Sequence, residues 1–319
     1  MVNIKVSNPY LPSVIHRQLP HQGAVWGNCR FYINQEVREC DYWIVLNNVT
    51  KEEKVNCPSG NTILFALEPP SIQKYKPAFL KQFSKVVSSQ KNIKHKDVIR
   101  TLTTVFWHPN KTYDDLASMH FVKKNKLISI ITSNKAYTEG HRRRLRFAYR
   151  LKEYFGDSID LFGRGIRPFA DKWEVLAPYK FTVAIENEWQ PDWITEKLTD
   201  CFLTYTFPFY YGCPNAEKYF RPDSFLRIDI NDFDQSRRII EGVLKNEQFY
   251  NDHFDKLEQS RKKTLNQYNF FSLVANKLIS FNSTDKLKKE IIILPEEKFA
   301  NNLDRLKKLF GLLNIFNKY

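Results

Sequence analysis

The chain has 319 residues, which fits one large α/β domain or two smaller domains. Hydrophobic residues make up 42% of it and glycine only ten positions, so a low-complexity chain is excluded and a sizeable core is expected. The net charge of +14 would suit nucleic acid, an anionic membrane or a phosphorylated ligand. Because no zinc-finger or RNA-recognition signature accompanies this charge, we do not expect nucleic acid to be a partner.

The five cysteines are widely spaced and odd in number, with neither metal-ligand spacing nor a disulfide framework. We therefore expect reduced, mostly buried thiols. The N-terminus shows no apolar signal segment, and no run of about eighteen apolar residues occurs in the sequence. These features predict a cytoplasmic protein.

In the first part of the chain, short apolar stretches alternate with polar ones. We expect strands over 41–47, 62–67 and 85–89 and a helix over 74–83. Strands that alternate with helices indicate a parallel sheet. Glu68, followed by Pro69 and Pro70, ends the second of these strands abruptly. An irregular, aromatic loop is expected over 104–115.

A second alternating series follows. It predicts strands over 127–132, 158–162 and 224–230 and helices over 139–154, 232–244 and 248–265. The helix over 139–154 is basic and amphipathic, with its apolar face formed by Leu145, Ala148, Tyr149 and Leu151. Together the two series predict an α/β fold with two lobes.

Polar residues gather in the stretch 179–212, where a strand ends and a helix begins. The apolar run Phe181–Ile185 predicts a buried strand, and Asp192 is the expected N-cap of the following helix. A second strand is expected over 206–211. In an open parallel sheet, ligands bind at such strand ends, and a helix N-terminus favours an anion such as a pyrophosphate. A solvated first helical turn without a ligand is the alternative interpretation.

The same stretch resembles the signature of the α-1,3-fucosyltransferases, which form glycosyltransferase family ten. The matching residues, in order, are Tyr179, Lys180, Phe181, Glu186, Asn187, Trp193, Thr195, Glu196, Lys197, Pro208 and Gly212. The resemblance implies the GT-B architecture, in which two Rossmann-like domains face a cleft. It implies an enzyme of the bacterial type, with an acceptor-binding domain over 1–125, a GDP-sugar-binding domain over 126–275 and a helical tail over 276–319.

The implied reaction is inverting transfer of L-fucose from GDP-fucose to a hydroxyl of a Gal/GlcNAc-type glycan, such as lipopolysaccharide, in α-1,3 or α-1,4 linkage. Such a transfer needs a base for the acceptor proton and positive charge for the departing diphosphate. Glu68, at the end of an apolar strand, is the expected base. A carboxylate that merely caps a loop is the alternative. The basic residues can replace a metal ion, so no divalent metal is expected to be required.

The resemblance also assigns donor-binding roles. Arg144 and Lys197 would bind the diphosphate, Glu196 the ribose hydroxyls, and Asn187 the diphosphate or the fucose. Thr195 belongs to the same signature. Glu186 would either orient the loop or touch the sugar, and Trp193 replaces the family's usual tyrosine. The match does not decide which arginine binds the diphosphate, because Arg142, Arg143 and Arg146 lie beside Arg144. All four arginines could instead form a solvated helix face.

Other features leave alternatives open. Glu188 replaces the serine usual in the family, so the donor could be a different nucleotide sugar, and a non-catalytic GDP- or glycan-binding module also fits. Trp107 and His108 could line the acceptor site or belong to a packed aromatic loop. In the tail, Leu303, Leu306, Phe310 and Leu313 share a helical face. That face suits peripheral contact with an anionic membrane, at its inner side, or docking on the protein itself.

Overall fold

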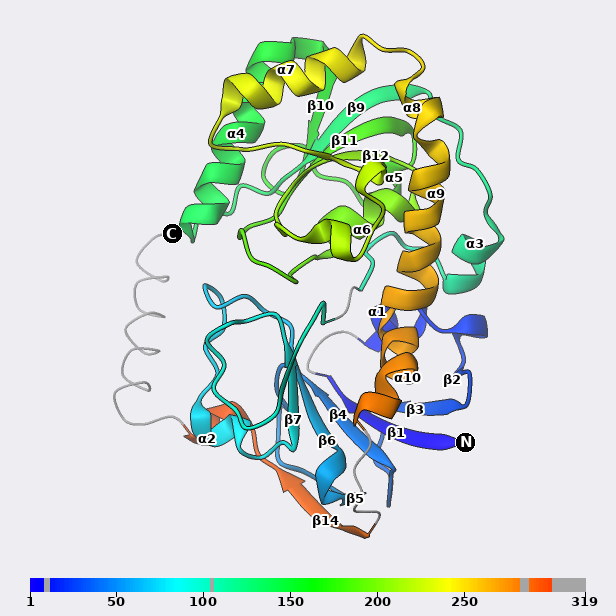
Figure 1. Cartoon of the computed structure of the whole chain (residues 1–319), viewed down its shortest axis with the longest axis vertical. Helices are drawn as coiled ribbons and strands as arrows, with labels where there is room; N and C mark the ends of the chain where they lie inside the picture. Colours follow the sequence, from blue (N-terminus) through cyan, green and yellow to red (C-terminus); the bar gives the residue numbers. More distant parts are fainter. Residues whose placement is uncertain (9–11, 104–105, 282–286, 300–319) are drawn as a thin grey trace. The chain divides into compact units, whose positions relative to one another are not determined.

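The structure is a computed structural model that describes residues 1–8, 12–103, 106–281 and 287–299 (Figure 1). The described residues divide into two compact units. The first unit contains 1–8, 12, 28–100, 279–281 and 287–299, and the second contains 13–27, 101–103 and 106–278. The expected domain limits at 125 and 275 therefore differ from this division. The amphipathic tail residues 303–319 lie outside the described residues.

The first unit is built on a parallel sheet. Its strands have the order β3-β1-β4-β6-β7-β8, with the bounds β1 (Val2–Ser7), β3 (Cys29–Ile33), β4 (Tyr42–Leu46), β6 (Thr62–Ala66), β7 (Lys85–Ser88) and β8 (Val98–Arg100). Every residue of β4 and β6 is buried, as expected for parallel strands that are covered on both faces. The predicted strands over 41–47, 62–67 and 85–89 are confirmed.

Two features of this unit differ from the sequence prediction. The helix expected over 74–83 is only α2 (Pro77–Leu80), because a proline cannot occupy a helix interior and the preceding Lys76 is extended, with ψ 135°. An antiparallel pair was also missed: β5 (Glu53–Pro58) pairs with β14 (Lys288–Ile293) from the end of the chain. Val55, Cys57 and Ile293 of this pair are buried, so a hydrophobic contact distant in sequence decides its formation.

The second unit contains a parallel sheet with the strand order β10-β9-β11-β12-β13. The bounds are β9 (Lys126–Ile131), β10 (Ile159–Phe162), β11 (Tyr179–Ile185), β12 (Phe207–Tyr211) and β13 (Leu226–Arg227). In chain order this is a 2-1-3-4-5 sheet, whose strand order reverses between β9 and β11. The strands expected over 127–132, 158–162, 181–185 and 206–211 are confirmed, whereas that over 224–230 is reduced to β13, because a 3-10 turn occupies Pro222–Ser224.

Helices cover both faces of this second sheet. Besides α2, the α-helices of the described residues are α1 (Pro12–His16), α3 (Tyr113–Ser118), α4 (Glu139–Phe155), α5 (Lys172–Leu176), α6 (Glu196–Leu203), α7 (Phe233–Leu244), α8 (Phe249–Asp252), α9 (Phe254–Lys263) and α10 (Phe270–Phe281). A short strand β2 (Val25–Trp26) lies between α1 and β3 in the sequence. The single helix expected over 248–265 is divided into α8 and α9, because His253 leaves helical geometry, with ψ near 0°.

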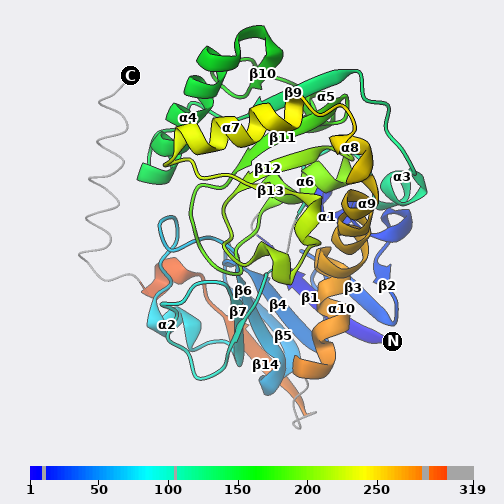
Figure 2. The same ribbon diagram turned by 45° about the horizontal axis from the view of Figure 1, so that its top comes forward.

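Helices α4 and α7 lie side by side on one face of the sheet, and α5 and α6 lie on the other (Figure 2). Phe147 of α4 meets Phe233 of α7 edge to face, with ring centroids 5.9 Å apart. The buried residues of α4 are His141, Arg144, Phe147, Ala148 and Leu151. The predicted apolar face of α4 is therefore rotated relative to the face that is buried. Tyr149 is 47% exposed, whereas Arg144 points into the protein. The five cysteines are buried and unpaired, as predicted.

Candidate active site

The candidate donor site lies where the strand order of the second sheet reverses. Helix α4 follows β9 at this point, and the loop to α6 follows β11. Arg144 of α4 is 5% exposed and donates hydrogen bonds to Asn187 Oδ1 and, over 3.3 Å, to Ser133 Oγ. The structure thus brings together Arg144 and Asn187, two residues predicted to bind the donor, at the position where doubly wound sheets bind ligands.

Burial separates Arg144 from the neighbouring arginines. Arg142 and Arg146 are exposed, and Arg142 pairs with Glu139 on its own helix over 2.9 Å. Burial lowers the pKa of Arg144, and the charges of Glu186 and Glu196 oppose this. The Nε of Arg144 is buried and has no hydrogen-bond partner among the described residues. A buried guanidinium with an unpaired donor fits an anionic ligand that completes its hydrogen bonds.

Glu186 positions the helix that follows it. Its fully buried carboxylate accepts hydrogen bonds from the Thr195 backbone N–H and hydroxyl, both over 2.8 Å. Thr195 in turn is the N-cap of α6, because its Oγ1 accepts from the Lys197 backbone N–H over 3.3 Å. Gly212 makes room for this arrangement, since a Cβ there would lie 2.4 Å from Glu186 Cγ. Of the two roles expected for Glu186, these contacts favour the orienting one.

The prediction that Asp192 is the N-cap of the helix was wrong. Asp192 has φ 59° and lies before the helix. Its carboxylate accepts hydrogen bonds from Asn215 Nδ2 over 2.8 Å, from Lys218 Nζ over 3.2 Å and from the Tyr219 hydroxyl. The aspartate therefore anchors the loop to a segment that follows β12, a partner that local sequence does not reveal.

Glu196 and Lys197 form an ion pair at the start of α6. Lys197 Nζ lies 3.1 Å from Glu196 Oε1 and 3.5 Å from Glu186 Oε2. Burial alone would lower the pKa of Lys197, but the charges of Glu196 and Glu186 raise it. Burial alone would raise the pKa of Glu196, but Lys197, Lys172 and His108 lower it strongly. Lys197 is therefore held as a cation and Glu196 as an anion, the forms needed to bind a diphosphate and ribose hydroxyls.

A second buried ion pair, which the sequence pattern did not predict, supports the same helix. Lys172 Nζ lies 2.7 Å from Asp200 Oδ2, and the Asp200 side chain is completely buried. The backbone N–H of His108 also donates to both oxygens of Asp200 over 3.3 Å. Asp200 lies one helical turn after Glu196, so the i, i+4 spacing in the signature block was an available signal.

We expect Lys172→Met to lower the free energy of unfolding by about 3–5 kcal/mol, because it leaves Asp200 buried and unpaired. Burial already raises the pKa of Asp200, while Lys172 opposes that rise. Without Lys172, the folded protein keeps a proton that the unfolded chain releases near pH 4, so stability falls as the pH rises above this value. Urea unfolding at about pH 5 and about pH 8 measures the loss, which should be larger at the higher pH.

The exposed Lys245, which pairs with Glu241 over 2.8 Å within α7, provides the control. Lys245→Met should leave the free energy of unfolding almost unchanged, because solvent screens an exposed ion pair. Adding Asp200→Leu to Lys172→Met should restore part of the stability. A loss in Lys172→Met no larger than in the control, or equal at both pH values, would contradict the interpretation.

The two tryptophans expected at the site are buried. Trp107 is 1% exposed, packs with Leu116, Leu203 and Leu265, and donates from Nε1 to Lys111 O over 2.9 Å. Its ring has no face available for a sugar, so the acceptor role expected of Trp107 does not fit this structure. His108 is exposed beside Asp200. Trp193 is 5% exposed, and Glu188 is partly exposed in the same loop.

Gly140, in the first turn of α4, was also missed. A Cβ at this position would lie 1.7 Å from the backbone oxygen of Asn187. Glycine within a predicted helix was the available signal, because it is unfavourable there without a packing reason. The absence of a side chain lets the start of α4 approach the loop after β11, which places Asn187 beside Arg144.

We expect Gly140→Ala to weaken GDP binding about tenfold, because the new methyl group must displace the backbone of Asn187 at a cost of about 1–3 kcal/mol. Isothermal titration calorimetry with GDP measures this effect. Gly242→Ala in α7 is the matched control, since no atom lies within 4 Å of a Cβ at that position. The control should keep the affinity for GDP and gain stability. Equal affinity in both variants would show that the close approach of Gly140 does not shape the site.

In the first unit, Glu68 follows the buried strand β6 and is partly exposed. Its backbone oxygen accepts a hydrogen bond from Gln90 Nε2 over 2.6 Å. The Gln90 side chain also donates to Gln73 O over 3.0 Å. The preceding Leu67 N–H donates to Asn47 Oδ1 over 2.6 Å. Segments that follow β4 and β7 thus hold the backbone around Glu68, and the residue lies at the strand end where it was predicted.

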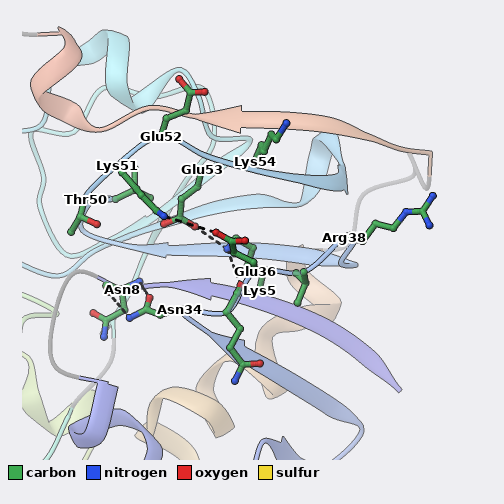
Figure 3. A pocket seen from close by; sticks show the side chains of 13 residues that line it. Lys5, Asn8, Asn34, Glu36, Arg38, Thr50, Lys51, Glu52, Glu53 and Lys54 are labelled. Atoms are coloured by element: carbon green, nitrogen blue, oxygen red, sulfur yellow. Dashed lines mark hydrogen bonds and ion pairs between the residues drawn. The ribbon is translucent and has the colours of Figure 1, made fainter.

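A charged hollow of about 730 Å³ lies over β1 and the segments that follow β3 and β4 (Figure 3). At its base, Lys5 Nζ is 2.8 Å from Glu53 Oε2, and the Lys5 side chain is 5% exposed. Ser7 Oγ donates to the same carboxylate oxygen over 2.7 Å. Charged residues line the rest of the hollow: Glu36, Arg38, Lys51, Glu52 and Lys54. The hollow offers hydrogen-bond donors and acceptors within the first unit.

Among the described residues, no group of three or more His, Cys, Asp and Glu side chains is arranged to hold a metal ion. Within the same part of the chain, no helix combines the length and the apolar character needed to cross a bilayer.

A model of the glycosyltransferase family 10 (fucosyltransferase) C-terminal domain matches residues 121–290, just over half of the chain. An α-(1,3)-fucosyltransferase of Helicobacter pylori is 31% identical over 117 residues, which cover 36% of this chain and 24% of that protein. A 4-galactosyl-N-acetylglucosaminide 3-α-L-fucosyltransferase of Homo sapiens is 33% identical over 91 residues, covering 27% and 25%. The aligned segments span about a quarter of the length of these curated relatives.

Solved structures show the fold. An α1,3-fucosyltransferase crystallised with GDP superposes with a TM-score of 0.53 and 17% identity, over 89% of this chain and 92% of that chain. The apo structure of OtsA superposes with a TM-score of 0.52 and 8% identity, over 88% and 99%. These neighbours are GT-B glycosyltransferases, so the predicted α/β class and GT-B fold are confirmed. Since the family model covers more than half of the chain, including Arg144 and the stretch from Tyr179 to Gly212, the chain belongs to glycosyltransferase family 10, the fucosyltransferases.

Proposed function

We propose that the protein is an inverting fucosyltransferase that moves L-fucose from GDP-fucose to a hydroxyl group of a Gal/GlcNAc-type glycan, in α-1,3 or α-1,4 linkage. The observation that carries this proposal is the buried Arg144, bonded to Asn187 and with an unpaired Nε, where the strand order of the second sheet reverses. Membership of family 10 and the fucosyltransferase names of the relatives support the same donor.

In the proposed reaction the acceptor oxygen attacks C1 of the fucosyl group while the bond from C1 to the GDP oxygen breaks. Glu68 takes the proton of the acceptor hydroxyl. Arg144 and Lys197 stabilise the negative charge that develops on the departing GDP, and Glu196 accepts hydrogen bonds from the ribose. One displacement inverts C1 and leaves no covalent bond to the protein, while charge at C1 resembles that of an oxocarbenium ion.

The buried network explains why these groups need little reorganisation when the donor binds. Glu186 holds Thr195, Thr195 caps α6, and the helix places Glu196 and Lys197 in its first turn. Donor groups that are already oriented lower the barrier more than groups that must be ordered during the reaction. The helix N-terminus adds positive potential for the diphosphate.

Acceptor binding is proposed for the first unit, which contains Glu68 and the charged hollow of Figure 3. Three further points stay predictions: independence from divalent metals, a cytoplasmic location at the inner side of a membrane, and membrane contact by residues 303–319. Adding EDTA to the assay described below tests the first of these.

Two alternatives differ from the proposal in chemistry. A transferase that uses another nucleotide sugar is favoured by Glu188 and Trp193, which replace the family's usual serine and tyrosine. A module that binds GDP or glycan without catalysis would retain the Arg144 site but show no turnover. A panel of nucleotide sugars separates the first alternative from the proposal, and the presence of turnover separates the second.

The decisive experiment measures GDP release from GDP-fucose by the purified chain, with and without lactose or N-acetyllactosamine. We expect release to rise when an acceptor is present and to continue in EDTA. Release from another nucleotide sugar only would favour the first alternative. Thermal stabilisation by GDP without release from any donor would favour the second alternative. If GDP does not stabilise the protein and no donor releases GDP, the donor site itself is contradicted.

A further inference from the structure

A second hollow, beside the candidate donor site, takes no part in the mechanism above. It has a volume of about 540 Å³ and lies at the end of β12 and β13 and the start of α7. The residues that define its chemistry are Trp189, Tyr211, Arg227, Asp229, Asn231 and Gln235. All of them belong to the second unit.

The aromatic part of the hollow consists of Trp189 and Tyr211. Trp189 follows Asn187 by two residues in the loop after β11 and is 51% exposed. Its ring centroid is 5.1 Å from that of Tyr211, with 43° between the ring planes. An indole buries a large apolar area when it is covered, so one that stays half exposed at the wall of a hollow has surface to offer to a ligand.

The polar part of the hollow is ordered by hydrogen bonds. Asp229 Oδ1 accepts from the Asn231 backbone N–H over 2.9 Å and from its Nδ2 over 2.8 Å. Arg227 forms an ion pair with Glu217, yet its Nη1 is buried and has no hydrogen-bond partner among the described residues. The hollow therefore contains fixed acceptors and is lined by an arginine that has one buried donor without a partner.

One arginine connects the hollow to the donor site. Arg143, the neighbour of Arg144, donates to the Tyr211 hydroxyl over 3.4 Å and to Asn231 Oδ1. Asn187, which binds Arg144, belongs to the same loop as Trp189. A ligand in the hollow would thus lie next to residues that hold the diphosphate in the proposed function.

We propose that this hollow is a pyranose-binding subsite, in which the apolar face of a sugar ring covers Trp189 and Tyr211. Planar polar side chains around the rings, from Asp229, Asn231 and Arg227, bind the sugar hydroxyls. The sugar is either the acceptor glycan or the fucosyl group of the donor, which share this chemistry. This inference rests on the proposed function, because that function supplies the two sugars.

The test compares Trp189→Ala and Trp189→Phe with the wild type. Loss of the indole should raise either the KM for N-acetyllactosamine or the Kd for GDP-fucose about tenfold. The Kd for GDP should stay within about twofold of the wild type. Trp189→Phe should recover much of the lost affinity, because it keeps an aromatic face. Tyr149→Ala on α4 is the control, since Tyr149 is also about half exposed but lies outside the hollow.

The outcomes separate the possible occupants. A raised KM for the acceptor assigns the subsite to the acceptor, and a raised Kd for GDP-fucose but not for GDP assigns it to the fucosyl group. An equal loss for GDP and GDP-fucose would mean that the hollow holds the nucleotide, which overturns the proposal. Unchanged constants in Trp189→Ala would overturn it as well.

Binding of free sugars distinguishes a failure of this inference from a failure of the proposed function. Ligand-observed NMR with lactose and with L-fucose needs no turnover. Sugar binding that disappears in Trp189→Ala supports the subsite even if the wild type releases no GDP. Turnover of GDP-fucose with sugar binding unaffected by Trp189→Ala would leave the proposed function intact and reject the subsite.

Discussion

Replacing Glu68 by glutamine is expected to lower kcat for fucosyl transfer by about 10²–10⁴-fold, the usual contribution of a general base. Glutamine keeps the size of the side chain but cannot take a proton from the acceptor hydroxyl. The backbone oxygen of Glu68, not its side chain, accepts from Gln90, so the substitution leaves that contact in place. Initial rates with saturating GDP-fucose and acceptor measure the effect.

Three controls make this result specific. Glu39→Gln changes a carboxylate in the same unit whose side chain is 61% exposed and which does not line the hollow of Figure 3, so its rate should equal that of the wild type. The Kd for GDP and the thermal midpoint of Glu68→Gln should also be unchanged, because the candidate donor site belongs to the second unit. A loss of less than about tenfold in kcat would remove Glu68 from the role of base. An equal loss in Glu39→Gln would point to a general effect of charge.

Arg144→Lys should weaken binding of GDP by about 10- to 100-fold. A hydrogen bond to a charged group contributes about 1.5–3 kcal/mol. Lysine keeps the charge but loses the planar group that bonds Asn187 and Ser133 and, in the proposed function, a phosphate. GMP should lose less affinity than GDP, because it has one phosphate fewer to bind. Isothermal titration calorimetry with both nucleotides provides the measurement.

Arg142→Lys is the matched control for this variant. It lies on the same helix, but its guanidinium is exposed and pairs with Glu139. Its affinity for GDP should change less than twofold, since exposed ion pairs contribute less than about 1 kcal/mol. Comparable losses in Arg142→Lys and Arg144→Lys would contradict the selection of Arg144. A fall in the thermal midpoint of ligand-free Arg144→Lys would reveal how much of its effect is structural.

The local pattern of the sequence predicted most elements that form the site. The apolar runs of β4, β6, β9, β11 and β12 are long enough to identify buried strands, because parallel strands covered on both faces are apolar throughout. Helix α4 was also recognised, and Ala148 and Leu151 of its expected face are buried, but the burial of Arg144 was not predicted. Arg144 occupies that face because Asn187 and Ser133, from other segments, give it hydrogen-bond partners in the interior.

The donor residues could be proposed from sequence because they lie close together in the chain, from Glu186 to Lys197. The order of Glu, Asn, Thr, Glu and Lys reflects one physical unit, in which a buried carboxylate holds the N-cap of the helix. Asp192 was misassigned as the N-cap because the assignment rested on residue type alone. Aspartate is a common N-cap, whereas its actual partners, Asn215, Lys218 and Tyr219, come from a distant segment.

The sequence alone determined the α/β class, the family and the strand–loop–helix unit of the candidate donor site, since each depends on residues that are neighbours in the chain. Only the tertiary structure decided which arginine is buried, that Trp107 is part of a core, that Gly140 must lack a side chain and that β14 pairs with β5. These features depend on contacts between segments far apart in the sequence. Burial and close packing act on atoms brought together by the fold, and no local pattern of residue types records them.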